Sequence, residues 1–159
     1  MEIKESKNLA GVNWEGKDLK GANLHLADLR KANLRGANLE KADLSFANLS
    51  EANLEEANLK GANLWQANLE KANLTKAILT EAELSFSYLT FANLVEADLT
   101  KTQLRTADLF RADIAGANFE EALFDRRDIP PLLDCRNWEK AKFSPDIREA
   151  LINYAEQLK

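Results

Sequence analysis

Ala52-Asn53-Leu54-Glu55-Glu56 and Ala62-Asn63-Leu64-Trp65-Gln66 are two copies of a five-residue unit that fills most of the chain. A small residue comes first, Asn or Asp second, and an apolar residue third. The apolar third residue recurs at every fifth position from Leu9 to Ile129, which makes about 25 consecutive units. Nearly all of these third residues are Leu, and the exceptions are Trp14, Ile114, Phe119, Phe124 and Ile129.

A period of five fits neither regular secondary structure. On an α-helix, five residues advance the side chain about 140° beyond a full turn, so the apolar residues would scatter around the axis. On one continuous strand they would alternate between opposite faces. A short extended segment followed by a bend buries them all, because the first and third residues of an extended segment point the same way. Asn and Asp suit frequent bends, since their side chains hydrogen-bond to nearby backbone. The period therefore predicts an all-β solenoid with a narrow interior.

The unit resembles the motif of the pentapeptide-repeat family, commonly written A(N/D)LXX, over roughly three quarters of the chain. The resemblance implies a right-handed quadrilateral β-helix with four units per coil, and therefore about six coils here. Residue spacings in the sequence support a coil of 20 residues independently, since Gly16, Gly36 and Gly116 are separated by multiples of 20, as are Phe46 and Phe86. The family is especially abundant in cyanobacteria, and membership implies a binding scaffold.

The repeat stops at two consecutive prolines. Ile129 is the last apolar third residue, and Pro130 and Pro131 follow it directly. We therefore predict a β-helix over residues 1–129 and a connector with a capping helix over residues 130–159.

The end of the chain predicts one α-helix at about residues 145–158. Ser144 is a candidate N-cap, with Pro145 in the first turn. An apolar helical face is formed by Ile147, Leu151, Tyr154, Ala155 and Leu158. An open solenoid end exposes unpaired backbone and apolar core, so we expect this helix to close the C-terminal end. A role in a dimer interface is the alternative. At the other end, Trp14 is expected to cover the core.

Composition narrows the classes of function and location. The net charge of -5 disfavours direct nucleic-acid binding. The single cysteine, Cys135, allows no intramolecular disulfide. The N-terminus has no apolar signal region, and no apolar run is long enough to span a membrane. We expect a cytoplasmic protein without a membrane partner.

Catalytic constellations are missing from the sequence. The only histidine, His25, lies far from Cys135 in the repeat order, and no Cys/His cluster could hold zinc. There is no glycine-rich phosphate loop. The carboxylates fall on outward positions of a convex rod, which offers no cleft. We therefore expect no enzymatic activity, no metal and no cofactor.

Aromatic residues supply the best functional lead. With 20 residues per coil, residues 20 apart stack in columns, and aromatic residues gather on one corner and the face beside it. Contiguous exposed apolar surface is typical of contact sites. The aromatic residues could bind a partner, stabilise the rod as a ladder, or hold a small molecule. The candidate interaction patch consists of Phe46, Trp65, Phe86, Tyr88, Phe91 and Phe110.

The sequence thus predicts a non-catalytic protein-interaction scaffold whose partner is another protein. The resemblance offers an alternative, since quinolone-resistance members of the family are acidic, dimeric rods that mimic DNA toward a type II topoisomerase. The modest net charge and alternating columns such as Lys31, Glu51 and Lys71 argue against that role here. Irregular first units and the C-terminal helix argue against end-to-end assembly. We also expect a monomer rather than a dimer.

Overall fold

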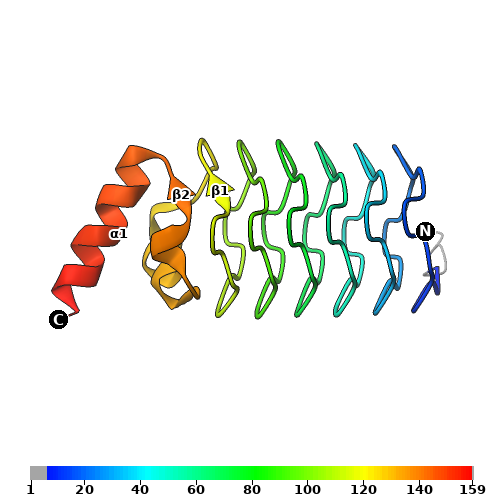
Figure 1. Ribbon diagram of the computed structural model, residues 1–159, viewed down its shortest axis with the longest axis horizontal. Helices are drawn as coiled ribbons and strands as arrows, with labels where there is room; N and C mark the ends of the chain where they lie inside the picture. Colours follow the sequence, from blue (N-terminus) through cyan, green and yellow to red (C-terminus); the bar gives the residue numbers. More distant parts are fainter. Residues whose placement is uncertain (1–6, 159) are drawn as a thin grey trace, which may run out of the picture.

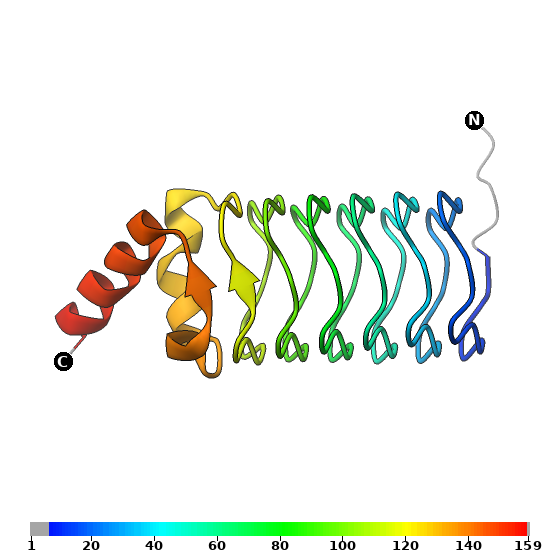
Figure 2. The same ribbon diagram turned by 45° about the horizontal axis from the view of Figure 1, so that its top comes forward.

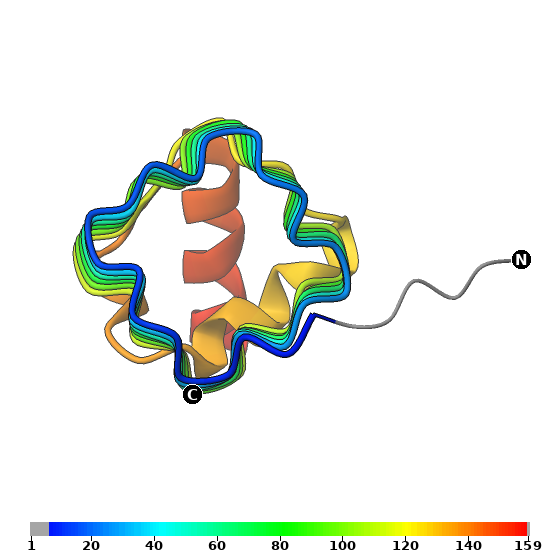
Figure 3. The same cartoon turned by 90° about the vertical axis from the view of Figure 1, so that its right-hand side faces the viewer.

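The computed structural model describes residues 7–158, which form a rod of stacked coils with a helix at one end (Figure 1). Parallel β-bridges join residues that lie one coil apart, from Asn8 with Asp28 to Gln103 with Leu123. Each coil therefore takes 20 residues, or four units, and the rod has about six coils. Viewed from the N-terminal end, the outline is four-sided, and the chain runs clockwise as it recedes, so the coil is right-handed (Figure 3).

Each corner of the square is a tight turn. The N–H of Ala27 donates to the carbonyl oxygen of Leu24 at 3.0 Å, and the fifth residue of the unit, Leu26, has a φ of 59°. A positive φ at this position is typical of type II turns. The side-chain oxygen of Asn23 accepts a hydrogen bond from the N–H of His25 at 3.2 Å, which explains the preference for Asn or Asp.

Neighbouring coils are joined by backbone and side-chain hydrogen bonds. The N–H of Leu24 donates to Asp43 O at 2.7 Å, and the N–H of Asp43 donates to Ala22 O at 2.9 Å. Outward amides also stack, as where Asn73 Nδ2 donates to Asn53 Oδ1 at 3.3 Å. The second position of the unit therefore stabilises both its own turn and the stack.

The interior is filled by the first and third residues of the units. The Leu and Ala side chains from Ala27 to Leu104 are almost completely buried. Ser87 and Thr102 take first positions, and their hydroxyls donate to the carbonyl oxygens of Leu84 and Leu99 at 2.6 and 2.7 Å. Because these buried hydroxyls are paired, they replace Ala without leaving an unsatisfied polar atom. Trp14 is half-buried against the N-terminal end of this core.

The segment after the last coil is more regular than the connector predicted from the sequence. It contains the 3-10 helices η1 (Arg126–Asp128), η2 (Pro130–Asp134) and η3 (Trp138–Lys140). Strand β2 (Lys142–Phe143) then pairs in parallel with β1 (Asn118–Phe119) of the last coil. The rings of Phe119 and Phe143 stack with centroids 5.1 Å apart. The chain thus adds one more short parallel strand to the stack of coils before it leaves the rod.

Helix α1 (Pro145–Gln157) lies at the predicted position. Leu151 is completely buried, whereas Tyr154 and Leu158 are 40% and 80% exposed, so only the N-terminal half of the predicted apolar face is covered. Figures 1 and 2 show why, because the helix tilts away from the rod toward its C-terminus. Ser144 does not cap the helix through its side chain; its hydroxyl accepts the N–H of Glu121 at 2.9 Å. No helix within residues 7–158 has the length and apolarity to cross a membrane.

Candidate interaction face

One corner of the rod carries a continuous ladder of rings. Hydrogen bonds between coils place its two columns side by side, as where the N–H of Phe46 donates to Trp65 O at 2.9 Å. The rings of His25, Phe46, Trp65 and Phe86 follow one another along the rod, and each contacts the next edge-on. We call these four residues the aromatic ladder. Leu26 extends the apolar corner toward the N-terminus and is 42% exposed, although the predicted patch omitted it.

The face beside the ladder carries the other three residues of the predicted patch. Tyr88 is the most exposed, at 54%, and its column neighbour is Asp108. Phe91 and Phe110 lie on the next corner and contact each other with centroids 6.1 Å apart. The guanidinium of Arg111 lies 5.3 Å from the Phe110 ring centroid, a cation–π contact that residue spacing alone did not indicate.

The six predicted residues therefore occupy two adjoining corners and the face between them, which we call the aromatic face. Five of them are exposed by 42–54%, and Trp65 is half-buried between the rings above and below it. Contiguous exposed apolar surface is typical of contact sites. The same ring contacts also stabilise the rod, so the ladder and the Tyr88 side of the face require separate tests.

His25, Ser45 and Asp43 form a short chain that superficially suggests a hydrolytic triad. His25 Nδ1 lies 2.7 Å from Ser45 Oγ, and the Ser45 hydroxyl donates to Asp43 Oδ1 at 2.6 Å. The serine is in the middle, so the carboxylate takes its proton and the imidazole is not oriented as a base. A nucleophilic triad needs the histidine between the other two groups. These hydrogen bonds between His25, Ser45 and Asp43 therefore stabilise the aromatic ladder and do not activate a nucleophile.

Charged side chains alternate in sign along the columns. Lys31 pairs with Glu51 at 3.7 Å, as one predicted column requires, whereas Lys71 pairs instead with its neighbour Glu70 at 3.0 Å. Lys20 Nζ lies 2.9 Å from Glu40 Oε2, and this hydrogen bond lowers the pKa of the Glu40 carboxyl. Exposed pairs contribute little stability each. Their effect is to break up any continuous acidic stripe.

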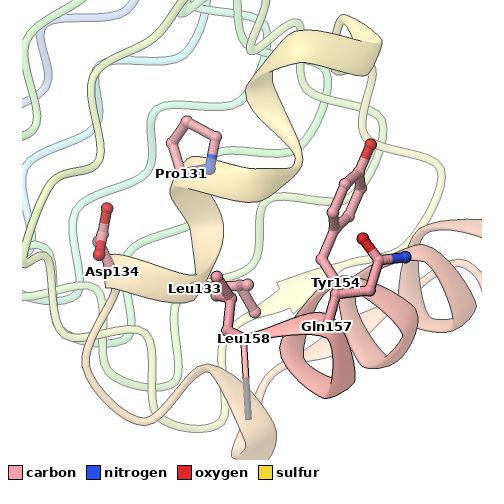
Figure 4. Close-up of a pocket in the computed structure, with 6 residues that line it drawn as sticks. All are labelled: Pro131, Leu133, Asp134, Tyr154, Gln157 and Leu158. Atoms are coloured by element: carbon pink, nitrogen blue, oxygen red, sulfur yellow. The ribbon is translucent and has the colours of Figure 1, made fainter.

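The C-terminal end has a shallow cleft between η2 and α1, with a volume of about 360 Å³ (Figure 4). Its lining is mostly apolar and consists of Pro131, Leu133, Asp134, Tyr154, Gln157 and Leu158. Asp134 is the one carboxylate among these six residues, and Tyr154 is the one other titratable side chain. Within residues 7–158, no cluster of three or more His, Cys, Asp or Glu side chains could hold a metal ion.

Cys135 is buried beside the last coil, and its Sγ donates to Leu109 O at 3.3 Å. Burial raises the pKa of the thiol to about 12, and the charges of Asp134 and Asp108 add to the shift. A thiol with so high a pKa is a poor nucleophile at neutral pH. Cys135 is therefore a packing residue at the end of the rod.

The coil is four-sided, and a residue with a left-handed backbone conformation stands at every corner. These features define the chain as a β-solenoid repeat protein. The profile of the family described as Pentapeptide repeats matches in eight copies, over residues 8–40, 27–66, 37–75, 57–90 and 87–126. The chain belongs to the pentapeptide repeat family.

Solved structures of the family resemble this rod. A trypsin-treated form of QnrB1, a plasmid-mediated fluoroquinolone resistance protein, is 14% identical, with 94% of this chain and 93% of that chain covered and a TM-score of 0.61. HetL, involved in heterocyst differentiation regulation in the cyanobacterium Nostoc, is 32% identical over 74% of this chain and 65% of that chain, with a TM-score of 0.36. A protein from the Arabidopsis thaliana thylakoid lumen is 26% identical over 79% and 74%, with a TM-score of 0.41. No curated protein sequence matches the chain.

Proposed function

We propose that this chain is a non-catalytic scaffold that binds another protein through its aromatic face. In this proposal the repeat region, expected over residues 1–129 and described from residue 7, forms the rod that presents the face; residues 130–159, described as far as residue 158, close its C-terminal end. One observation carries the proposal: five aromatic residues on two adjoining corners and the face between them expose 42–54% of their surface. Aromatic side chains on a rigid element are enriched at the centres of protein interfaces, since they bury large area at low entropic cost.

A protein fits this face better than other ligands do. The face is convex, and a small molecule needs a concave site that encloses most of its surface. A nucleic acid needs a basic surface, whereas the columns pair acids with bases, as Lys76 does with Glu96 at 3.7 Å. We further propose that the protein is cytoplasmic and that it is a monomer. Cell fractionation tests the location, and size-exclusion chromatography of the purified chain tests the oligomeric state.

The experiment compares binding by wild type and by variants of matched chemistry. Tyr88→Ser, Phe91→Ser and Phe110→Ser together remove the exposed rings outside the ladder. Ile78→Ser and Leu123→Ser remove residues of similar exposure, 43% and 44%, from other faces. We expect a partner captured from the host lysate by wild type to be lost by the first variant and kept by the second, with both variants showing a β-rich spectrum. Equal capture by all three proteins rules out binding through Tyr88, Phe91 and Phe110, the part of the aromatic face outside the ladder.

A second candidate is DNA mimicry toward a type II topoisomerase. It is supported by the fold shared with QnrB1, a fluoroquinolone resistance protein, and by nothing finer. Duplex mimicry needs a continuous anionic surface, which the paired columns do not provide. Supercoiling by purified DNA gyrase in the presence of a quinolone tests it directly. Protection by this chain establishes the second candidate, and lack of protection removes it.

A further inference from the structure

The first coil that the structure describes has backbone donors and acceptors without a backbone partner among residues 7–158. In the second coil, Asn33 reaches the first coil twice: its N–H donates to Val12 O at 2.8 Å, and its carbonyl oxygen accepts the N–H of Trp14 at 2.7 Å. The equivalent N–H groups of the first coil, on Asn13, Asp18 and Asn23, have no backbone acceptor within residues 7–158. Rows of unpaired donors and acceptors promote pairing with another chain.

A second copy of this chain fits such an edge best. One added strand pairs with a single side, whereas another four-sided coil pairs with all four. The C-terminal end of a second copy is not available, because β2, η2 and α1 occupy it. The two N-terminal ends would therefore meet through a two-fold axis perpendicular to the rod, which makes facing strands antiparallel.

One orientation of that axis avoids like charges. If it passes through the sides that carry Asn13 and Asn23, each of these residues meets its own equivalent in the second copy. Asn8 then meets Asp18, and the negative side chains of Asp18 stay apart. The half-buried Trp14 side chains lie on the same side as Asn13 and would contact each other. The edge is therefore compatible with a symmetric dimer.

Two lysines oppose this pairing. Lys7 and Lys17 take the first, inward position of their units, since their carbonyl oxygens accept the N–H groups of Asp28 and Asn38 at 2.8 and 2.9 Å. In the next coil the same position holds buried alanines, Ala27 and Ala37.

Both lysine side chains lie across the open end. The ammonium of Lys7 donates to the carbonyl oxygen of Asn23, one of the edge acceptors. Lys17 Nζ lies 5.9 Å from the centre of the Trp14 ring. The carboxylates at this end are engaged on the outer surface, where Glu15 pairs with Arg35 at 3.7 Å and Asp18 accepts Asn38 Nδ2 at 2.9 Å. Among residues 7–158, no acid is therefore placed to neutralise the two ammonium groups inside a stacked pair.

We propose that the N-terminal edge is a latent self-association surface for a second copy of the chain, and that Lys7 and Lys17 keep it closed. Stacking two copies would bury four ammonium groups between two coils without counter-charges from residues 7–158, which is strongly unfavourable. Inward-pointing charges are a recognised protection of sheet edges. This inference is independent of the aromatic face, which lies on the sides of the rod.

The test replaces both Lys7 and Lys17. The double variant Lys7→Ala with Lys17→Ala carries the residue that interior coils have at this position, so the fold is retained, and circular dichroism checks this. Sedimentation velocity over a range of micromolar concentrations is expected to show wild type as a monomer and the double variant at twice that mass. A matched control, Lys41→Ala with Lys60→Ala, removes two exposed lysines that form no ion pair within residues 7–158 and is expected to stay monomeric.

Amide hydrogen exchange then locates the contact. In the double variant, the N–H groups of Asn13, Asp18 and Asn23 are expected to exchange at least tenfold more slowly as the concentration rises. Adding Asp18→Pro, which removes an edge donor, is expected to restore the monomer. Four results overturn the proposal: a monomeric double variant, a dimeric wild type, a dimeric control, or a dimer whose edge amides remain unprotected.

Discussion

The rings of Phe46 and Trp65 meet edge-on, with centroids 4.9 Å apart and an interplanar angle of 84°. Trp65 makes a second edge contact with Phe86 at 6.1 Å, so it links the two phenyl rings of the ladder. Such contacts stabilise by about 0.5–1.5 kcal/mol each beyond the burial of area. The ladder therefore has a structural role that exists without any partner.

Trp65→Ala is expected to lower the free energy of unfolding by about 1–3 kcal/mol, because it removes both ring contacts. Tyr88→Ala, at a residue with no ring contact in residues 7–158, is expected to change it by less than about 0.5 kcal/mol. Urea titration followed by circular dichroism measures both values. Equal effects of the two substitutions contradict the separation of the face into a stabilising ladder and an exposed recognition side.

The residues at the corners adopt a left-handed backbone conformation, which costs conformational free energy. Glu81 has a φ of 61°, and a residue with a Cβ pays about 1–2 kcal/mol for this conformation. Glu81→Gly is therefore expected to raise the unfolding free energy by about 0.5–1 kcal/mol, after the greater freedom of glycine in the unfolded chain is subtracted. Thermal unfolding measures the change.

The neighbouring residue provides the control for that substitution. Thr80 precedes Glu81 in the same turn and does not have a positive φ. Thr80→Gly is expected to destabilise by about 0.5–1 kcal/mol, because glycine adds freedom to the unfolded chain and relieves no strain. Shifts of the melting temperature in the same direction for the two substitutions would contradict backbone strain at the corner.

Most of the rod could be predicted because one physical rule repeats. A buried Leu54, a small Ala52 and a turn-forming Asn53 are needed in every unit, so each unit repeats the same information. The aromatic positions followed from the coil length, since residues 20 apart must stack. The partial burial of Trp65 did not follow, because it depends on how rings in two adjacent columns interlock.

The C-terminal end was less predictable because it breaks the period. The position of α1 followed from Pro145 and the apolar spacing, but the exposure of Tyr154 depends on the tilt of the helix. The strand β2 has only two residues, Lys142 and Phe143, and no local pattern distinguishes it from a loop. The pairing of Ser144 with Glu121 joins residues far apart in the sequence. These features arise from tertiary contacts rather than local preference.

Core truncation should show how stability is distributed along the rod. Leu54 is completely buried in the middle, and Leu54→Ala is expected to cost about 2–5 kcal/mol through lost contacts and a residual cavity. Leu9 is only half-buried in the first coil, so Leu9→Ala is expected to cost less than half as much. Urea unfolding of both variants measures the difference. Equal costs contradict a rod whose terminal coil has a neighbour on one side only.

Because the thiol of Cys135 is buried, the free energy of unfolding is expected to fall as the pH rises into the alkaline range. Its pKa is about 12 in the folded chain and about 8.5 in an unfolded chain, so the unfolded state loses its thiol proton first. A folded pKa above the unfolded value gives stability that is complete below the unfolded pKa and declines as the pH rises toward 12. Between pH 8 and pH 10 the loss is about 2 kcal/mol, at about 1.4 kcal/mol per pH unit above the unfolded pKa.

Cys135→Ala separates this effect from the titration of lysines and tyrosines over the same range. The variant keeps a small buried side chain but has no proton to lose. Urea midpoints measured at pH 8 and pH 10 are expected to fall more for wild type than for the variant, by an amount equivalent to about 2 kcal/mol. Parallel curves would show that the thiol ionises as readily in the folded chain as in the unfolded one. That result would require water to reach Cys135, and the contact between the last coil and η2 would then be open in solution.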